Sequence, residues 1–279
     1  MTVVVTADII GSRALADRVS AQRELDDAIV RVEADLPAAI RPLTPTVGDE
    51  LQGIYPTLDA ALASILLLRL TLPDGIDCRF GVGIGAVGTV PSRAGDIAEG
   101  PGWWAAREAI DALHAAQVRA MPAVRTWVAA ASGGAAPQIP AGAAPDAVSV
   151  DAASHSTDGA EAGALGAAAA GSAGLSASAI AAAAPAPASG GGRNLSAPAA
   201  DIALGDTVRL ANAYVWARDE LVTAMTTRAR RLVYGRCLGQ TQRSLAEREG
   251  ISQPAVSQLL AASGAAVVVA GFRALTGDG

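Results

Sequence analysis

A segment of low complexity divides the chain and limits what it can fold into. Residues 129–200 contain 56 Ala, Gly, Pro or Ser residues among 72, and none of the 72 is aromatic. Such a segment cannot bury enough large apolar surface to offset the entropy lost on ordering. We therefore predict a low-complexity, disordered linker over 129–200 between two folding units, an N-terminal domain over 1–128 and a helical domain over 201–279.

Charge and residue usage exclude several functions. All 21 basic residues are arginines, and a chain without lysine has neither the phosphate-binding loop G-x-x-x-x-G-K-[ST] nor Schiff-base chemistry. The net charge of −6 argues against nucleic-acid binding over the whole surface. Residues 207–248, however, hold 8 Arg against 3 acidic residues, which predicts a basic binding module near the C-terminus.

Targeting and redox features are absent from the sequence pattern. Met1–Val5 is apolar, but Asp8 follows at once, so the pattern is not that of a signal peptide. Cys78 and Cys237 lie in different regions and predict neither a disulfide framework nor a metal site. No stretch reaches the roughly 20 strongly apolar residues of a membrane span. We expect a cytoplasmic protein without a membrane partner.

Strand and helix patterns alternate along residues 1–128. The predicted elements are a strand at 3–9, a helix ending before Pro37, strands at 43–47 and 51–55, a helix at 59–72, a strand at 78–87, a helix at 103–118 and a strand at 124–128. This βαββαβ order, with one added helix and strand, predicts an α+β, ferredoxin-like domain with its helices on one side of the sheet.

Two acidic residues occupy special positions in that topology. Asp8 lies at the end of the first strand, and Asp49 lies in the hairpin between the second and third strands. The first and third strands are neighbours in a ferredoxin-like sheet, so the two carboxylates are expected to converge on a hard cation such as Mg²⁺. Gly11 and Ser12 follow Asp8 and would let backbone N–H groups approach a phosphate. The alternative is that Asp49 supplies turn chemistry and Asp8 caps a loop.

Four sequence blocks of the N-terminal domain resemble the SatD family. The blocks are Thr6–Arg13 (TADIIGSR), Val47–Gly53 (VGDELQG), Arg79–Gly85 (RFGVGIG) and Gly100–Arg107 (GPGWWAAR). They are similar, more distantly, to the catalytic core of class III nucleotidyl cyclases and GGDEF proteins. The resemblance covers residues 1–128 and, after the linker, most of 204–262.

The resemblance to cyclases implies roles for individual residues. Asp8 and Asp49 match the two metal-binding aspartates, and Ile9 matches the residue whose carbonyl joins them, which implies Mg²⁺ or Mn²⁺ as cofactor. Arg107 matches the arginine that stabilises the phosphate in the transition state, and would be catalytic in an active enzyme. The expected nucleotide- and phosphate-binding residues are Gly11, Ser12, Arg13 and Arg107. Class III sites form between two protomers, which implies a homodimer.

Two departures from the cyclase pattern bear on catalysis. Cyclases place an asparagine that orients the ribose four positions before the arginine, and this chain has Trp103 there. The lysine that selects the base in adenylyl cyclases has no counterpart in a chain without lysine. Cyclisation depends on positioning the ribose oxygen in line with the α-phosphate. The resemblance therefore implies metal and triphosphate binding in a degenerate domain.

The C-terminal region carries a helix-turn-helix pattern. Residues 204–236 have helical periodicity, as one helix or two, and residues 241–262 form the motif, with Gly250 in its turn. The motif resembles the sigma-factor and MarR-like class. The residues expected to contact DNA are Arg243 at a phosphate and, on the second helix and its cap, Ser252, Gln253, Ser257 and Gln258. A helical hairpin that packs or dimerises without touching DNA is the alternative.

Together these features favour a SatD-like transcriptional regulator. In this hypothesis a degenerate, metal-dependent nucleotide-binding domain is coupled to a DNA-binding helix-turn-helix. One alternative is an active class III-like nucleotidyl cyclase or transferase that uses Mg²⁺, so whether the chain is an enzyme stays open. Another is a non-catalytic interaction protein that docks on a protein partner such as RNA polymerase. Its nucleotide partner would be a nucleoside triphosphate or a cyclic or linear nucleotide.

Overall fold

The computed structural model describes residues 2–12, 17–46, 49–91, 97–131 and 199–277. All of these residues belong to one compact unit. Residues 132–198, which make up most of the predicted linker, lie outside the described part of the chain, and so does Arg13. The ends of the predicted linker lie within regular elements, since one strand extends to Ala130 and one helix begins at Ala199. The domain boundaries and the disorder of the linker stay predictions.

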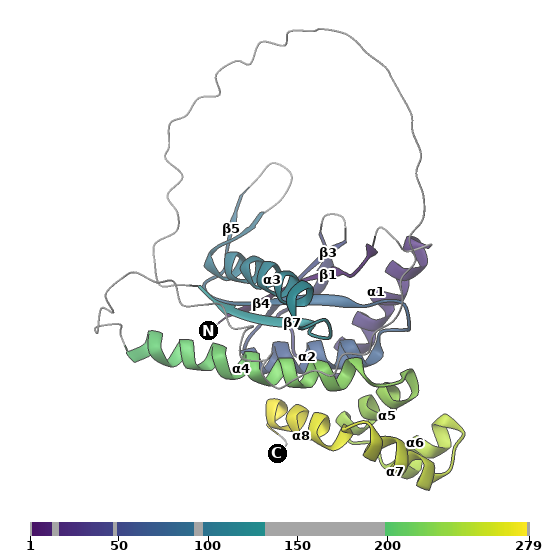
Figure 1. The fold of residues 1–279 in the computed structure, drawn as a ribbon. Coiled ribbons are helices and arrows are strands. Elements are labelled where there is room, and N and C mark those ends of the chain that lie inside the picture. The colour runs from purple at the N-terminus through teal and green to yellow at the C-terminus, as the bar shows by residue number, and fades with distance from the viewer. Residues whose placement is uncertain (1, 13–16, 47–48, 92–96, 132–198, 278–279) are drawn as a thin grey trace, which may run out of the picture. The chain divides into compact units, whose positions relative to one another are not determined.

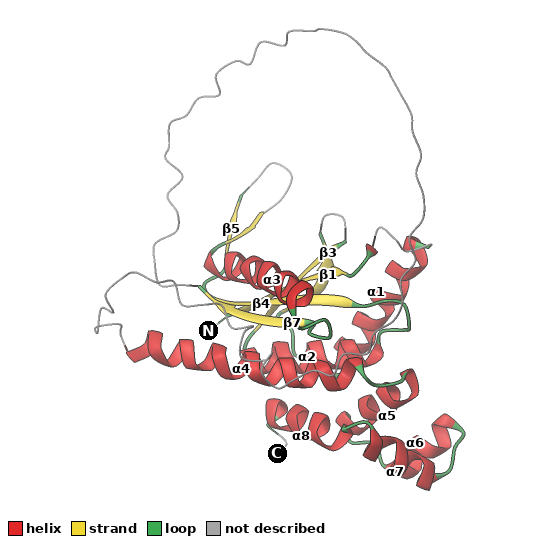
Figure 2. Cartoon of the chain, in the orientation of Figure 1, coloured by secondary structure: helices red, strands yellow, loops and turns green. Residues whose placement is uncertain are grey.

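The described chain is a mixed α+β structure (Figures 1 and 2). Its strands are β1 (Val3–Ile9), β2 (Arg41–Pro45), β3 (Glu50–Tyr55), β4 (Cys78–Ile84), β5 (Gly88–Val90), β6 (Ile97–Glu99) and β7 (Thr126–Ala130). Its helices are α1 (Arg18–Asp35), α2 (Leu58–Thr71), α3 (Pro101–Arg119), α4 (Ala199–Thr223), α5 (Thr227–Cys237), α6 (Gln242–Glu249), α7 (Gln253–Ala262) and α8 (Ala265–Thr276). We call residues 2–131 the sheet segment and residues 199–277 the helical module.

The main sheet has five strands in the order β2-β3-β1-β4-β7. β1 pairs antiparallel with both β3 and β4, and β7 is added in parallel at the outer edge of β4. The predicted neighbourhood of the first and third strands is therefore present, because a βαββαβ path brings them together. The register sets Asp8 opposite Glu50 on one side and opposite Arg79 on the other.

Helices cover both faces of this sheet, which corrects the expectation that they lie on one side (Figure 1). Successive side chains of a strand point to opposite faces. Val3, Val5 and Ala7 of β1 join the core formed with α1 and α2, while Val4 packs with Trp103 of α3. The patterning of β1, apolar on both faces over Val3–Val5, is what a strand buried on both faces requires.

Glycines on β4 let α3 lie close to the sheet. A Cβ atom on Gly81 would lie 2.3 Å from the carbonyl oxygen of Ala106, and one on Gly83 would lie 2.1 Å from that of Gly102. Both distances are far inside van der Waals contact with backbone atoms that cannot give way. The alternation of glycine with large residues in β4 therefore positions α3 and the residues that α3 carries.

Helix α2 is buried on two sides. It contacts β1, β3 and β4 on one side and α5 and α8 on the other, and every residue from Ala61 to Leu70 is buried. A helix that is apolar all round requires such an environment. Buried residues of the sheet segment and of the helical module consequently belong to one continuous hydrophobic core.

Helix α4 closes the outer edge of the sheet. The side-chain amide of Asn212 donates to the carbonyl oxygen of Val128 in β7 and accepts from its N–H, both at 2.8 Å. An edge strand otherwise presents unpaired backbone groups on which another strand can form. Trp216 of α4 and Trp127 of β7 add a tilted ring contact with centroids 4.8 Å apart.

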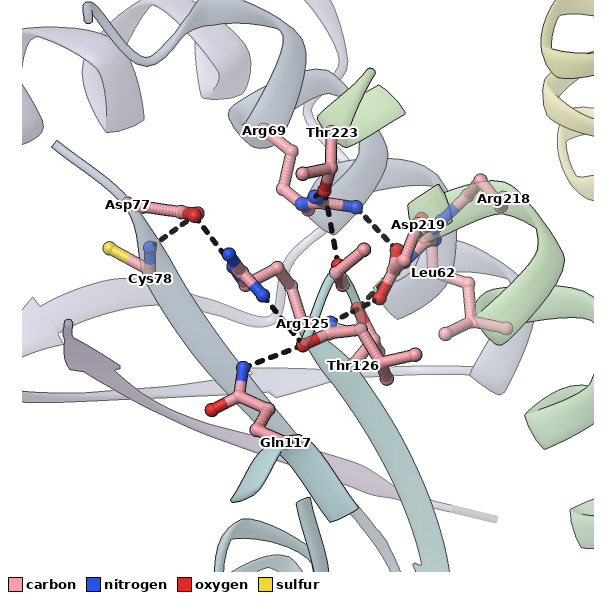
Figure 3. Close-up of polar contacts among 12 residues, drawn as sticks. Leu62, Arg69, Asp77, Cys78, Gln117, Arg125, Thr126, Arg218, Asp219 and Thr223 are labelled. Atoms are coloured by element: carbon pink, nitrogen blue, oxygen red, sulfur yellow. Dashed lines mark hydrogen bonds and ion pairs between the residues drawn. The ribbon is translucent and has the colours of Figure 1, made fainter. Parts of the chain in front are cut away.

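A buried ionic network joins α4 to α2 and β7 (Figure 3). Asp219 is fully buried and accepts from the Arg69 guanidinium at 2.5 Å, from Arg218 at 2.8 Å and from the backbone N–H of Arg125 at 2.7 Å. Arg218 also donates to the hydroxyl of Thr126 at 2.7 Å. The carboxylate of Asp219 therefore pairs with two buried arginines. Hydroxyl and backbone oxygens accept further hydrogen bonds from the two guanidinium groups.

Three elements, the strands β5 and β6 and the helix α8, were not predicted from the sequence. The β5–β6 hairpin extends beyond the main sheet next to the start of α3, and α8 follows the helix-turn-helix (Figure 1). Within the described residues no single helix is long and apolar enough to cross a membrane; α7 and α8, bent by 80° relative to each other, meet the length and composition criteria as a pair.

Candidate functional site

Asp8 lies at the end of β1 on the face covered by α3. One carboxylate oxygen accepts from the Arg79 guanidinium at 2.9 Å, and Arg79 is held in turn by the side chain of Gln117 at 2.6 Å. The other carboxylate oxygen, Oδ1, is buried and has no hydrogen-bond partner among the residues that the structure describes. A buried carboxylate oxygen without a partner is costly, and it is free to accept a cation.

Asp49 lies close enough to Asp8 to act on its ionisation. Burial raises the pKa of the Asp8 carboxyl, the neighbouring Arg79 opposes that shift, and the negative charge of Asp49 adds to it. The pKa of Asp8 is therefore raised above its ordinary value. A cation bound beside these two carboxylates would offset the negative charge that Asp49 adds near Asp8.

Glu50 and Arg107 complete the charged cluster. Glu50 is the first residue of β3, directly opposite Asp8. Its two carboxylate oxygens accept from one nitrogen of Arg107 at 2.9 and 3.1 Å, and Oε1 also accepts from Gln52 at 2.9 Å. Arg107 extends from α3 and its side chain is 62% exposed. The structure thus brings Arg107 to the end of the sheet that carries Asp8.

A divalent cation fits this donor set only in part. Among the described residues no group of three or more His, Cys, Asp or Glu side chains is arranged to hold a metal ion. Asp8 and Asp49 offer two carboxylates, and the carbonyl of Ile9 is the third donor that the resemblance implies. Mg²⁺ keeps several waters and binds through one or two carboxylates plus substrate phosphates, so two acidic residues suffice for a cation that arrives with a nucleotide.

The backbone after β1 turns away from the sheet at the expected glycine. Gly11 has φ of 67° and is exposed, whereas Ser12 is buried. The N–H of Ile10 donates to the carbonyl of Asp77 at 2.8 Å, which fixes the direction of the turn. Of the residues expected at a phosphate, Gly11 and Ser12 therefore adjoin Asp8, and Arg13 lies outside the described residues.

The two adjacent tryptophans of α3 have different surroundings. Trp103 is buried against Val4 and Ala106, and the Arg41 guanidinium lies 5.5 Å from its ring centroid. Trp104 is 39% exposed on the outer side of the helix. No polar side chain is therefore presented at position 103, where the cyclase pattern has its ribose-orienting asparagine.

Sequence reasoning missed two residues of this cluster. Glu50 and Arg79 stand inside the blocks that carry the SatD resemblance, but neither was given a role. For Glu50 the signal was its place next to Asp49 at the start of a strand that pairs with β1. For Arg79 no local signal existed, since its pairing with Asp8 depends on strand order alone.

Helices α6 and α7 are short and are joined by a tight turn. Gly250 ends α6 in the left-handed conformation with φ of 65°, and the Ser252 hydroxyl accepts from the N–H of Ala255 as the cap of α7. Both features match the sequence pattern, because a left-handed position favours glycine and a helix start favours serine. The inner faces are buried through Leu245, Ala246 and Val256.

The residues expected to read DNA all lie on the surface. The exposed set is Arg243, Ser252, Gln253, Ser257 and Gln258. Arg243 pairs with Glu247 one turn away at 3.3 Å. Arg231 of α5 pairs with Glu249 of α6, and this pairing lowers the pKa of the Glu249 carboxyl. Arginines therefore lie on the surface of α5 and α6, and the start of α7 is exposed as well.

Comparisons with known proteins identify the sheet segment. Residues 2–123 match the model of the SatD family, which confirms the resemblance that the sequence motifs of this segment carry. No curated protein matches the chain.

Solved structures of adenylyl cyclases are similar at a low level. A bacterial light-regulated adenylyl cyclase is 13% identical, with a TM-score of 0.35 over 46% of this chain and 74% of that one. A second structure under the same description is 16% identical, with a TM-score of 0.35 over 46% of this chain and 42% of that one. The adenylyl cyclase CyaB from P. aeruginosa is 13% identical, with a TM-score of 0.30 over 38% and 68%. The fold of this chain is defined by its own strand order, β2-β3-β1-β4-β7, and not by these similarities.

Proposed function

We propose that the sheet segment binds a nucleoside triphosphate together with Mg²⁺ or Mn²⁺ at the end of β1. Asp8, Asp49 and the carbonyl of Ile9 would hold the cation, and Gly11, Ser12 and Arg107 would contact the phosphates. The cation would neutralise the phosphate oxygens and draw them toward β1. In this proposal the domain senses a nucleotide and the helical module reads DNA, as in a transcriptional regulator.

The observation that carries the proposal is the partnerless oxygen of Asp8. Within the described part of the chain Oδ1 is buried without a hydrogen bond, while the second oxygen is fixed by Arg79 at 2.9 Å. The charge of Asp49 acts on the same carboxyl. A purely structural aspartate would satisfy both oxygens, since buried polar atoms are almost always paired. A cation that binds Oδ1 would remove both the missing contact and the repulsion.

Equilibrium binding tests this site. An ATP and a GTP that carry a fluorophore on the ribose are titrated with the full chain, with Mg²⁺ and with EDTA. We expect Mg²⁺-dependent binding that Asp8→Asn and Asp49→Asn weaken at least tenfold. Asp111→Asn is the matched control, because Asp111 is an exposed acidic residue of α3 outside the site. Absence of binding, or equal binding by Asp8→Asn, contradicts the proposal.

Catalytic turnover is a separate question with its own test. The exposed Arg107 favours an active cyclase, whereas the buried apolar Trp103 offers nothing to orient a ribose. We propose a degenerate domain, because cyclisation depends on that orientation. Incubation with each triphosphate under Mg²⁺ and Mn²⁺ should give no cyclic or linked product. A product that depends on Arg107 would instead establish the cyclase alternative.

We propose DNA binding for the helix-turn-helix. The support is the exposure of Gln253, Ser257 and Gln258 on α7 and of Arg243 on α6. Polar side chains there can reach base edges in the major groove, and arginines can contact phosphates. Footprinting on the DNA upstream of the gene that encodes this chain tests DNA binding, with the double variant Gln253→Ala/Gln258→Ala as the comparison. Binding without steep salt dependence, or no protection, favours a protein partner instead.

A homodimer is the assembly that we propose for nucleotide binding. Trp104 of α3 and Val90 of the β5–β6 hairpin are large exposed apolar side chains that a second copy of the chain would cover in this proposal. Sedimentation with and without triphosphate and Mg²⁺ measures the assembly. A monomer under both conditions contradicts this part of the proposal.

A further inference from the structure

Two arginines of the described chain near the candidate cation site are bound to carboxylates, but they are held differently. Arg79 is 15% exposed and is fixed at two points, by Asp8 and by Gln117. Arg107 is 62% exposed, and its hydrogen bonds run to Glu50 alone within the described residues. Arg79 is therefore a fixed part of the sheet, whereas Arg107 can leave its partner by rotating a solvated side chain.

Glu50 lies where a cation would act on it. Its Cα is paired with that of Asp8 across β1 and β3, and paired residues in antiparallel strands lie about 4.5–5.5 Å apart at their Cα atoms. It also follows Asp49 directly in sequence. A divalent cation held by Asp8 and Asp49 would therefore attract the Glu50 carboxylate and repel the Arg107 guanidinium.

We propose that Glu50 is a positioning residue that holds Arg107 away from the phosphate position until a cation and a nucleotide bind. In this proposal the cation weakens the ion pair between Glu50 and Arg107. The negatively charged phosphates then replace Glu50 as the partner of Arg107. Arg107 would thus contact phosphate only when the cation is present. This inference rests on the proposed nucleotide site, and it adds a reason why binding should depend on the cation.

Removing the negative charge of Glu50 should strengthen the binding of triphosphate. Glu50→Gln keeps the size of the side chain and its hydrogen bond with Gln52, but it releases Arg107. In EDTA we expect the labelled triphosphate to bind Glu50→Gln about fivefold more tightly than the unchanged chain. Fivefold corresponds to the roughly 1 kcal/mol that a partly exposed ion pair contributes. With Mg²⁺ the gain should shrink, since the cation has already released Arg107.

A double-mutant cycle separates this effect from general electrostatics. Removing any negative charge near an anionic ligand improves binding, and Glu108→Gln is the matched control, because Glu108 is the exposed neighbour of Arg107 on α3. The specific gain from Glu50→Gln must disappear in an Arg107→Ala background, whereas a general charge effect would persist there. Glu50→Asp, which retains the charge, should restore most of the original affinity.

Each outcome bears on the proposal. An Arg107-dependent gain in EDTA supports it, even if the unchanged chain binds too weakly to measure. A gain that survives Arg107→Ala, or one that Glu108→Gln reproduces, overturns it. A tenfold loss of Mg²⁺-dependent binding in Glu50→Gln also overturns it, because Glu50 would then be a metal ligand. If no variant binds triphosphate under any condition, the proposed function and this inference both fail.

Discussion

Replacing Asp219 by Asn should strongly destabilise the whole chain. The substitution preserves the size of the side chain but removes the charge that compensates Arg69 and Arg218, whose side chains are only 4% and 1% exposed. Breaking a buried pair by removing one partner costs about 3–5 kcal/mol, because the remaining charge is left without compensation. Since a domain is stable by roughly 5–15 kcal/mol, this is a large fraction of the total.

The assay is urea unfolding of the full chain, followed by tryptophan fluorescence and by circular dichroism. Trp127 and Trp216 touch each other across β7 and α4, so fluorescence reports on this junction. Asp206→Asn is the control, because Asp206 lies on the same helix and pairs with Arg209 in solvent. Exposed pairs contribute about 0–1 kcal/mol. A loss below about 1 kcal/mol for Asp219→Asn would refute the argument that the network holds α4 to the sheet.

The same carboxylate sets a dependence on pH. Burial alone would raise the pKa of Asp219, but the charges of Arg69 and Arg218, with the N–H of Arg125, lower it below its ordinary value of 3.8. A group whose folded pKa is lowered stabilises the fold above its unfolded pKa, and that contribution is lost as the pH falls toward the folded pKa. The unchanged chain should therefore lose more stability than Asp219→Asn between about pH 5 and pH 3.

Three further outcomes follow from the packing. Asn212→Ala should cost about 1–3 kcal/mol in urea unfolding, because it leaves the N–H and carbonyl of Val128 unpaired. Gly83→Ala should lower the free energy of unfolding by about 3 kcal/mol, since the new Cβ would lie 2.1 Å from the carbonyl oxygen of Gly102. Gly88→Ala is the control and should cost under about 1 kcal/mol, because its Cβ would lie 3.6 Å from the nearest described atom, the carbonyl oxygen of Glu99. A fragment of residues 1–131 should aggregate or bind an apolar dye, because the outer side of α2 loses α5 and α8; a monomeric, dye-free fragment with cooperative unfolding would contradict the shared core.

The local elements could be predicted because their signals are local. The run Val3–Val5 predicts a buried strand, and β1 spans the predicted residues. Gly250 and Ser252 mark the turn and cap between α6 and α7, and both have those roles. Such signals depend on residues within one turn or one strand, so the sequence pattern contains them completely.

The junction between the sheet segment and the helical module could be predicted only in part. The Leu- and Ala-rich pattern of α2, interrupted by Ser64 and Arg69, favours burial on both sides, but it does not say which helices supply the second side. The bond between Arg69 and Asp219 joins residues 150 positions apart, and no local pattern connects them. The low-complexity segment lies between them in the sequence and gives no sign that the described residues on its two sides share one core.

The sequence pointed to Asp8, Asp49 and Arg107 as candidate site residues, but it gave no role to Glu50 and Arg79, which pair with Arg107 and Asp8. Asp8 and Asp49 stand at positions that a βαββαβ topology brings together. The pairs Asp8–Arg79 and Glu50–Arg107 depend on strand register and on the height of α3 above β4. That height is set by the absence of side chains on Gly81 and Gly83, which is a consequence of packing.

Localising the cation tests the central claim most directly. Mn²⁺ added with triphosphate broadens the NMR signals of nearby amides, and the full chain can be titrated with and without Asp8→Asn. The account predicts broadening first at Ile9, Asp49 and Glu50, and its loss in Asp8→Asn. Broadening confined to another acidic surface, such as Asp26 and Asp27 of α1, or broadening that Asp8→Asn leaves unchanged, would contradict a cation site at the end of β1.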